Sequence, residues 1–560
     1  MSMVGEDRDS FAGNAYESAG EHRGLSRRAL LKGTAGAIVA ATGASLAGAI
    51  GTGAQVEGLE PGPEVPSFRR PMASLTYLDQ KQYIHNMEIH GHLSGSTISG
   101  GEPLMAMWAK GKQRLLPAGG GFVDASDPKN PVVLNQGVVR GNGPVVYNTK
   151  LKKWIMMTTA AAPLSSAIPQ FPHGQYDKEL RDKSVNYKGL RGIRTYDITD
   201  PTKPILLEEF STGEKGNGTH HNFYDGGKYA YLDCGWDDQL RLENHQRPFS
   251  NALMIVDMSD PSSVKEVSRW WVPGQRLGEE EEYRKFVFAG DHSSWSGNHG
   301  AISVPKRVED GGNVGYGGFG AFGMYVMDLS DITKPKPFGK VQYEFNAIGT
   351  IPFHTCYPVM SDAAHPRLQN LVVGTHEALE ADCREVYHTP YVVDVKDLRN
   401  PKIIGFFPRP VAPPDAPYSD FCFARGRFGS HNTQCWLAPG APHPEIIAIA
   451  WFNAGIRVFD MSNPTAPKEV AWFVPPRDGD INNYASWWRG TSENVFVEWD
   501  RNLIWLGTHE GTYYLSSPAL GKPVLEPRRI EKWSVAHCNV GWDDQTAHSV
   551  YFGRSLSQLG

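Results

Sequence analysis

The chain lacks most of the features that reveal a protein's function at first sight. Only 21% of its 560 residues are charged and the formal net charge is −6, so neither nucleic acid nor an anionic membrane surface is an expected partner. Six cysteines in this length do not make a disulfide scaffold. The sequence has no Gly-rich phosphate loop, GxSxG elbow, HExxH or CxxC, which disfavours nucleotide hydrolysis, α/β-hydrolase chemistry and c-type haem.

Long apolar runs are also missing beyond the N-terminal segment, so no integral membrane span is expected in the mature protein. Turn-forming residues, in contrast, are abundant, with 60 Gly and 40 Pro, and there are 15 Trp. This composition favours many short strands joined by turns. Length alone would suggest several domains, but an all-β fold of this size can form one unit.

The N-terminal segment has the sequence of an export signal. Ser26-Arg27-Arg28-Ala29-Leu30-Leu31-Lys32 precedes a weakly apolar, Gly/Ala-rich run, and this arrangement resembles a twin-arginine (Tat) signal peptide with cleavage after Ala54. The resemblance implies export by the Tat translocase to the periplasm or the extracellular space. We expect a signal peptide over residues 1–54, a linker over 55–74 and a single domain over 75–560. An ordinary N-terminal helix or a membrane anchor is the alternative, although the many glycines make this a poor helix.

A repeat organises the long C-terminal part. Six segments share an apolar run, an Asp, a second Asp or Asn shortly after it, often Pro, and then a second apolar run. The first Asp of each segment is Asp124, Asp197, Asp257, Asp328, Asp394 or Asp460. Each segment predicts a strand, an Asx-type turn and a second strand. A degenerate seventh copy covers residues 513–525. Two further strand-like runs precede each pair, so the unit has four strands.

Four-stranded units repeated about seven times are typical of a β-propeller. At the run Ile255-Val256-Asp257 and its counterparts, the chain resembles the LVIVD-repeat propeller family over residues 75 to 560. We therefore expect an all-β, seven-bladed β-propeller, with six and eight blades as alternatives. Strands from both chain ends are expected to close the ring, by joining residues 534–552 to residues 105–139 in one blade and so removing the open edge.

Histidines recur at the start of the innermost strand of these units. The residues in this register are His221 (with His220 beside it), His299, His354, His431 and His537. The same position is Pro144 in the first unit and Asn494 in another. In a four-stranded meander these strand starts lie on the face that carries the long loops, so the imidazoles should converge at one mouth of the central channel.

Converging neutral imidazoles can hold a transition metal, and we predict one ion, iron or copper in preference to zinc. Side chains at the ends of two second strands should reach the same mouth and serve as supporting or acid/base groups. These side chains are His376, Glu377, His509 and Glu510. The alternative is a structural belt, in which each histidine descends from one ancestral repeat and binds the neighbouring blade.

Other groups carry weaker indications. Cys356, Cys435 and Cys538 follow register histidines and could be ligands or a nucleophile, although buried packing is the simpler interpretation. Cys383 and Cys422 lie in long loops and could form a disulfide after export. A segment with His85, His90 and His92 could bind metal or serve as a surface or capping segment.

The sequence leads to a preferred function and two alternatives. The preferred function is an exported, metal-dependent oxidase or oxygenase that acts on a small, partly apolar organic molecule. The alternatives are a non-catalytic binding propeller and a metal-dependent hydrolase.

Overall fold

The computed structural model describes most of the repeat region and none of residues 1–76. The described residues are 77–94, 107–110, 112–162, 182–183, 185–238, 251–285, 297–300, 302–342, 351–379, 381–383, 385, 389–440, 442–482, 487 and 490–521. The expected signal peptide, linker, His537 and Cys538 lie outside them, as does the run 534–552. The described residues belong to one compact unit, Leu59–Gly560.

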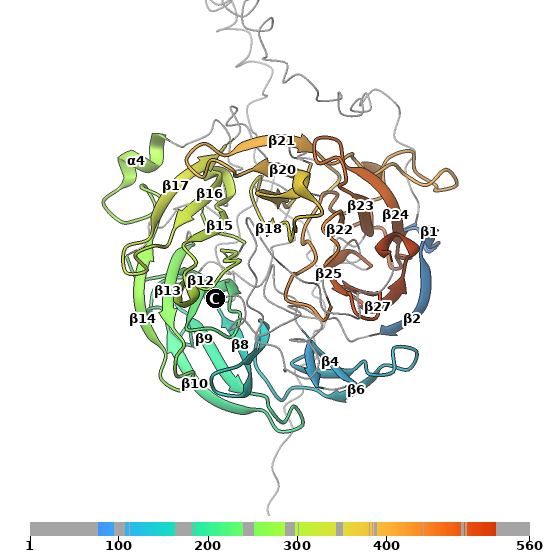
Figure 1. Ribbon diagram of the computed structural model, residues 1–560. Coiled ribbons are helices and arrows are strands. Elements are labelled where there is room, and N and C mark those ends of the chain that lie inside the picture. The colour runs from blue at the N-terminus through green and yellow to red at the C-terminus, as the bar shows by residue number, and fades with distance from the viewer. Residues whose placement is uncertain are drawn as a thin grey trace, which may run out of the picture. The chain divides into compact units, whose positions relative to one another are not determined.

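Seven antiparallel sheets form the blades of a β-propeller around a central axis (Figure 1). The first blade comprises β3 (Trp108–Lys110), β4 (Gln113–Ala118), β5 (Gly121–Asp124) and β6 (Val132–Asn135). The second comprises β7 (Val145–Asn148), β8 (Lys153–Ala160), β9 (Gly192–Asp197) and β10 (Ile205–Ser211). The third comprises β11 (Gly218–Phe223), β12 (Tyr229–Gly235), β13 (Ala252–Asp257) and β14 (Lys265–Trp270). The fourth comprises β15 (Val314–Gly318), β16 (Met324–Asp328) and β17 (Lys336–Val341).

Of the remaining three blades, the sixth and the seventh incorporate strands from before the first blade. The fifth comprises β18 (Cys356–Pro358), β19 (Leu371–Gly374), β20 (Tyr391–Asp394) and β21 (Lys402–Phe406). The sixth comprises β22 (Ile446–Ala450), β23 (Ile456–Asp460), β24 (Lys468–Val474) and β1 (Tyr83–His85). The seventh comprises β25 (Ser492–Glu498), β26 (Leu503–Thr508), β27 (Gly511–Ser516) and β2 (Glu88–Ser94).

Helix is scarce in the described part of the chain. Besides single helical residues at 182, 183, 185 and 487, it comprises α4 (Glu280–Lys285) and the short 3-10 turns η1 (Val308–Asp310), η2 (Gly320–Phe322), η3 (Pro366–Leu368), η4 (Phe421–Phe423) and η6 (Pro518–Leu520). None of the helices in these residues is long and apolar enough to cross a membrane. The expected all-β, seven-bladed architecture is therefore confirmed.

The repeated Asp residues act as turn formers, as predicted. Each ends a strand (β5, β9, β13, β16, β20 or β23) and accepts a hydrogen bond from the backbone N–H two residues later, at 2.7–3.0 Å, which is the geometry of an Asx turn. The six residues are Asp124, Asp197, Asp257, Asp328, Asp394 and Asp460.

Both ends of the chain contribute to ring closure, but in a different blade from the one expected. The blade around Asp124 already has four strands of its own, because β3 and β4 precede it. The shared blade is the seventh, where the N-terminal strand β2 pairs with β27. The degenerate seventh repeat explains this arrangement, since β2 supplies the outer strand. The segment with His90 and His92 is thus this outer strand, and both rings stack on tyrosines of β27.

Candidate metal centre

The register histidines of four successive blades meet at the axis. His221 lies within β11 of the third blade. His299, His354 and His431 belong to the fourth, fifth and sixth blades, where they precede β15, β18 and β22. Adjacent imidazole centroids are 4.9 Å apart for His221 and His299, 4.7 Å for His299 and His354, and 4.9 Å for His354 and His431. All four side chains are buried. The predicted convergence is found for these four, whereas His537 lies outside the described residues.

Glycines allow the backbones of neighbouring blades to approach this point. A Cβ on Gly300 would lie 2.2 Å from the carbonyl oxygen of His354, and one on Gly318 would lie 2.0 Å from the same atom. Such distances exclude any side chain at either position, so the close approach of the two blades requires glycine there.

Glu377 places a carboxylate among the imidazoles. Its Oε2 lies 2.8 Å from Nε2 of His299 and 3.4 Å from Nε2 of His354, and its Oε1 lies 3.7 Å from Nε2 of His431. His299, His354 and Glu377 each offer a ligand atom within 4.8 Å of the others. The sequence predicted Glu377 as a supporting or acid/base group, but its position also suits a direct ligand.

Arg427 determines which carboxylate oxygen is available. Its guanidinium forms a buried ion pair with Oε1 of Glu377 and also donates to the carbonyl oxygen of Ala378. Its Cζ lies 3.9 Å from the ring centroid of Phe452. Because Arg427 holds Oε1, Oε2 remains directed at His299 and His354.

The protonation states of Glu377 and His299 follow from this environment. Burial alone would raise the pKa of Glu377, but Arg427 and the surrounding imidazoles outweigh it and hold the pKa well below the usual value. Burial lowers the pKa of His299 well below its usual value, although Glu377 opposes this shift. Near neutral pH, Glu377 is thus ionised and His299 is neutral, which is the protonation state that metal ligation requires.

Three of the imidazoles are oriented through Nδ1. Nδ1 of His221 contacts the carbonyl oxygen of His299, and Nδ1 of His354 lies 2.7 Å from Oγ1 of Thr355. Nδ1 of His431 lies 3.0 Å from the carbonyl oxygen of Glu493 and 3.0 Å from its Oε2. A hydrogen bond at one ring nitrogen fixes the ring and leaves the other nitrogen for a ligand.

Glu493 continues the network towards solvent. Burial opposes the ionised form, yet His431 and His509 lower the pKa of Glu493 far below the usual value. Its Oε1 lies 2.7 Å from Nε2 of His509, a side chain that is 43% exposed. His509 is therefore connected with the buried cluster through Glu493.

The other two predicted supporting residues have different contacts. His376 is buried and its Nδ1 lies 2.9 Å from Oγ of Ser430. Glu510 follows β26, where its backbone N–H donates to Oγ1 of Thr508 at 3.3 Å. Neither belongs to the groups with ligand atoms within 4.8 Å of one another.

Sequence reasoning missed Arg427 and Glu493. Arg427 lies in a Pro-rich loop without a motif, so nothing in the sequence connects it with Glu377. Glu493 immediately precedes Asn494, the residue that replaces the register histidine in the seventh blade, and this place in the register was the signal available.

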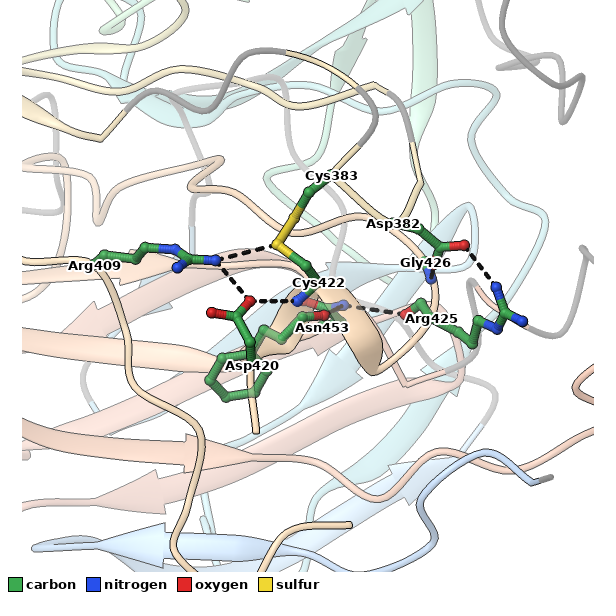
Figure 2. Close-up of a disulfide and its surroundings, with 9 residues drawn as sticks. Asp382, Cys383, Arg409, Asp420, Cys422, Arg425, Gly426 and Asn453 are labelled. Carbon is green, nitrogen blue, oxygen red and sulfur yellow. Dashed lines mark hydrogen bonds and ion pairs between the residues drawn. A yellow bond between two sulfur atoms is a disulfide. The ribbon is translucent and has the colours of Figure 1, made fainter. Parts of the chain in front are cut away.

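The cysteines divide into two kinds. Cys356 and Cys435 are fully buried, and burial raises the pKa of both thiols, so they remain neutral packing residues. Cys383 and Cys422 form a disulfide (Figure 2). Figure 2 also shows Arg409 in contact with Asp420 and with Sγ of Cys422.

This disulfide connects the two loops that supply the central ion pair. Cys383 lies six residues after Glu377 and Cys422 lies five residues before Arg427. The Asp382–Arg425 ion pair and the hydrogen bond from the N–H of Gly426 to Asp382 join the same loops beside it. The covalent link therefore restricts the relative movement of Glu377 and Arg427.

Comparison with known proteins supports the architecture. The LVIVD repeat family model matches residues 249–271 and 448–473, which cover β13 and β14 of the third blade and β23 and most of β24 of the sixth. No curated protein matches the chain. The seven sheets show a β-propeller, and two of its blades match the LVIVD repeat.

Proposed function

We propose that the imidazole cluster binds a transition metal, iron or copper in preference to zinc, and that the protein is an exported oxidase or oxygenase. One observation carries the metal proposal. His354 and His431 have Nδ1 held by neighbouring groups while their Nε2 atoms face the carboxylate of Glu377. Histidines that only fastened neighbouring blades together would not need to direct their second nitrogens at one point.

The donor set suits the proposed metals. Imidazole nitrogens with one carboxylate oxygen are ligands that iron, copper and zinc accept. When bound, such an ion would supply O₂-dependent oxidation chemistry. Glu377 would bind or orient through Oε2, and Arg427 would keep the carboxylate in place.

A buried aromatic ring beside the cluster supports a small, partly apolar substrate. The ring of Phe452 stacks on His431 with centroids 4.7 Å apart, and Arg427 covers the same ring. Phe452 has a φ of +34°, a left-handed conformation that costs a bulky residue about 1–3 kcal/mol and is typical of functional sites. His509, exposed and oriented by Glu493, is positioned to exchange a proton with a bound molecule.

Metal analysis of the purified mature protein tests the proposal. We expect a stoichiometric transition metal, a fall in melting temperature with a chelator, and loss of the ion held by His354 and Glu377 in His354→Ala. His365→Ala is the matched control, because His365 lies in the turn before β19 and pairs with Asp362. Protein without metal, and with unchanged melting in chelator, would leave the Arg427–Glu377 pair and its histidines as a structural belt.

Export is proposed from the Arg27-Arg28 motif, and the Cys383–Cys422 disulfide supports it because such bonds persist mainly in oxidising compartments. Replacing both arginines with lysine should retain the protein in the cytoplasm in a cell-fractionation experiment. Unchanged export of this double variant would exclude the Tat route.

A further inference from the structure

A second group of histidines lies beside the site described above. His220, His221 and His299 each offer a ligand atom within 4.8 Å of the others. The rings of His220 and His221 have centroids 3.7 Å apart, and those of His220 and His299 are 4.8 Å apart. This group shares only His299 with the group of His299, His354 and Glu377.

A β-bulge brings His220 into this group. Consecutive side chains of a regular strand point to opposite faces of the sheet, so His220 and His221 should diverge. The pairing of β11 with β12 shifts register between Thr219 and Asn222, and bulges of this kind re-aim side chains next to functional sites. Both rings therefore lie on the same side of the strand. The repeat provides at most one register histidine per blade, so His220 is an addition that the architecture does not require.

The two nitrogens of His299 face different partners. A carboxylate only accepts hydrogen bonds, so Nε2 of His299, at 2.8 Å from Oε2 of Glu377, is the protonated nitrogen. A neutral imidazole then has its lone pair at Nδ1. Nδ1 is therefore the ligand atom that His299 contributes to the group with His220 and His221, while Nε2 is hydrogen-bonded to Glu377. A carboxylate that orients a ligating imidazole in this way is a common feature of metal sites.

We propose that His220, His221 and Nδ1 of His299 form a second metal-binding position next to the one at His354 and Glu377. Glu377 connects the two positions, since its Oε2 faces His299 of one and His354 of the other. Its negative charge, with that of Glu493, offsets part of the charge of two neighbouring cations. The inference rests on the proposed metal function of the cluster and changes its stoichiometry from one ion to two.

Copper titration of the mature, chelator-stripped protein tests this proposal. We expect two Cu²⁺ per chain by elemental analysis, with an electron paramagnetic resonance spectrum broadened by the interaction of two nearby ions. His220→Ala should bind one Cu²⁺ and give the sharper spectrum of an isolated ion, because His220 belongs only to the second position. His354→Ala should likewise retain one ion, held by the histidines of the second position, and His365→Ala should retain two.

The outcomes separate the two proposals. One Cu²⁺ in the wild-type protein, retained by His220→Ala and lost from His354→Ala, would overturn the second position and leave the proposed function in place. Two ions in both the wild type and His220→Ala would also overturn it. No binding by the wild-type protein would refute the metal function itself. A single wild-type ion that is lost from His220→Ala and kept by His354→Ala would support the second position and refute the first.

Discussion

Two buried glutamates of this propeller have opposite surroundings. Glu377 lies among imidazoles with one arginine, whereas Glu498, at the end of β25, is held by arginines. Arg114 of the first blade and Arg501 of the seventh both bind Glu498, and Trp505 also donates to it. Arg114 also binds Asp500, and Arg501 donates to backbone carbonyls of the first blade.

The difference separates a structural carboxylate from a functional candidate. Glu498 connects the first and last blades with donors that can only donate and remain charged. Glu377 is surrounded by groups that can exchange a proton for a metal. Burial raises the pKa of Glu498 despite its arginines, while Arg427 and the imidazoles lower that of Glu377 against the effect of burial. Burial alone is therefore no guide to function here, and the identity of the partners is the useful observation.

The largest expected effect is a loss of stability on removing Arg114, which holds the structural carboxylate Glu498. Arg114→Met leaves Glu498 and Asp500 with fewer positive partners in the interior, which typically costs about 3–5 kcal/mol. We expect a large fall in the urea unfolding midpoint with no change in metal content. Lys153→Met is the control, because Lys153 pairs with Asp197 at 2.8 Å but is 49% exposed, and such a pair contributes about 0–1 kcal/mol. Equal effects of both substitutions would refute a closing role for Arg114.

The complementary substitution is Glu377→Gln, which keeps the shape of the side chain and removes its charge. If Glu377 binds or orients the metal, affinity should fall by about 10–100-fold or more. Competition with a chelator of known affinity measures this fall. Glu498→Gln is the matched control and should retain wild-type metal affinity while losing stability. Metal affinity unchanged by Glu377→Gln would show that this carboxylate belongs with Glu498 as a structural group.

The sequence predicts those features whose interacting residues are close together in the chain or recur with the repeat, and it does not predict contacts between distant segments. The Asx turns are specified within a few residues, so Asp257 and its counterparts were predictable, and so was the blade count. The histidine register follows from the repeat, which explains why His299 and His354 were found. The partners of Glu377 and Glu498 were not predictable, because Arg427 comes from an irregular loop and Arg114 from the opposite end of the ring. The bulge that redirects His220 depends on strand pairing and has no signature in the sequence.

A third buried carboxylate, Asp225, extends the comparison, and the change in stability expected from it is the smallest. Asp225 is buried between the third and fourth blades and pairs with Arg307 at 3.0 Å. Burial raises its pKa to about 6, which Arg307 counteracts and Glu309 reinforces. The native state therefore binds a proton between about pH 6 and the ordinary value of 3.8 that the unfolded state does not bind. This group makes the protein more stable as the pH falls through that window, in contrast to a carboxylate whose pKa is lowered.

Asp225→Asn removes this titration and keeps the acceptor for the N–H of Gly227. Between pH 7 and pH 5, the wild-type free energy of unfolding should gain about 1 kcal/mol relative to the variant. Urea unfolding of both proteins at the two pH values measures this difference, and effects of all other titrating groups cancel in it. A relative shift of the opposite sign would mean that Arg307 dominates over burial. Asp225 would then resemble Glu377, and the contrast between arginine-held and imidazole-held carboxylates would not hold for this molecule.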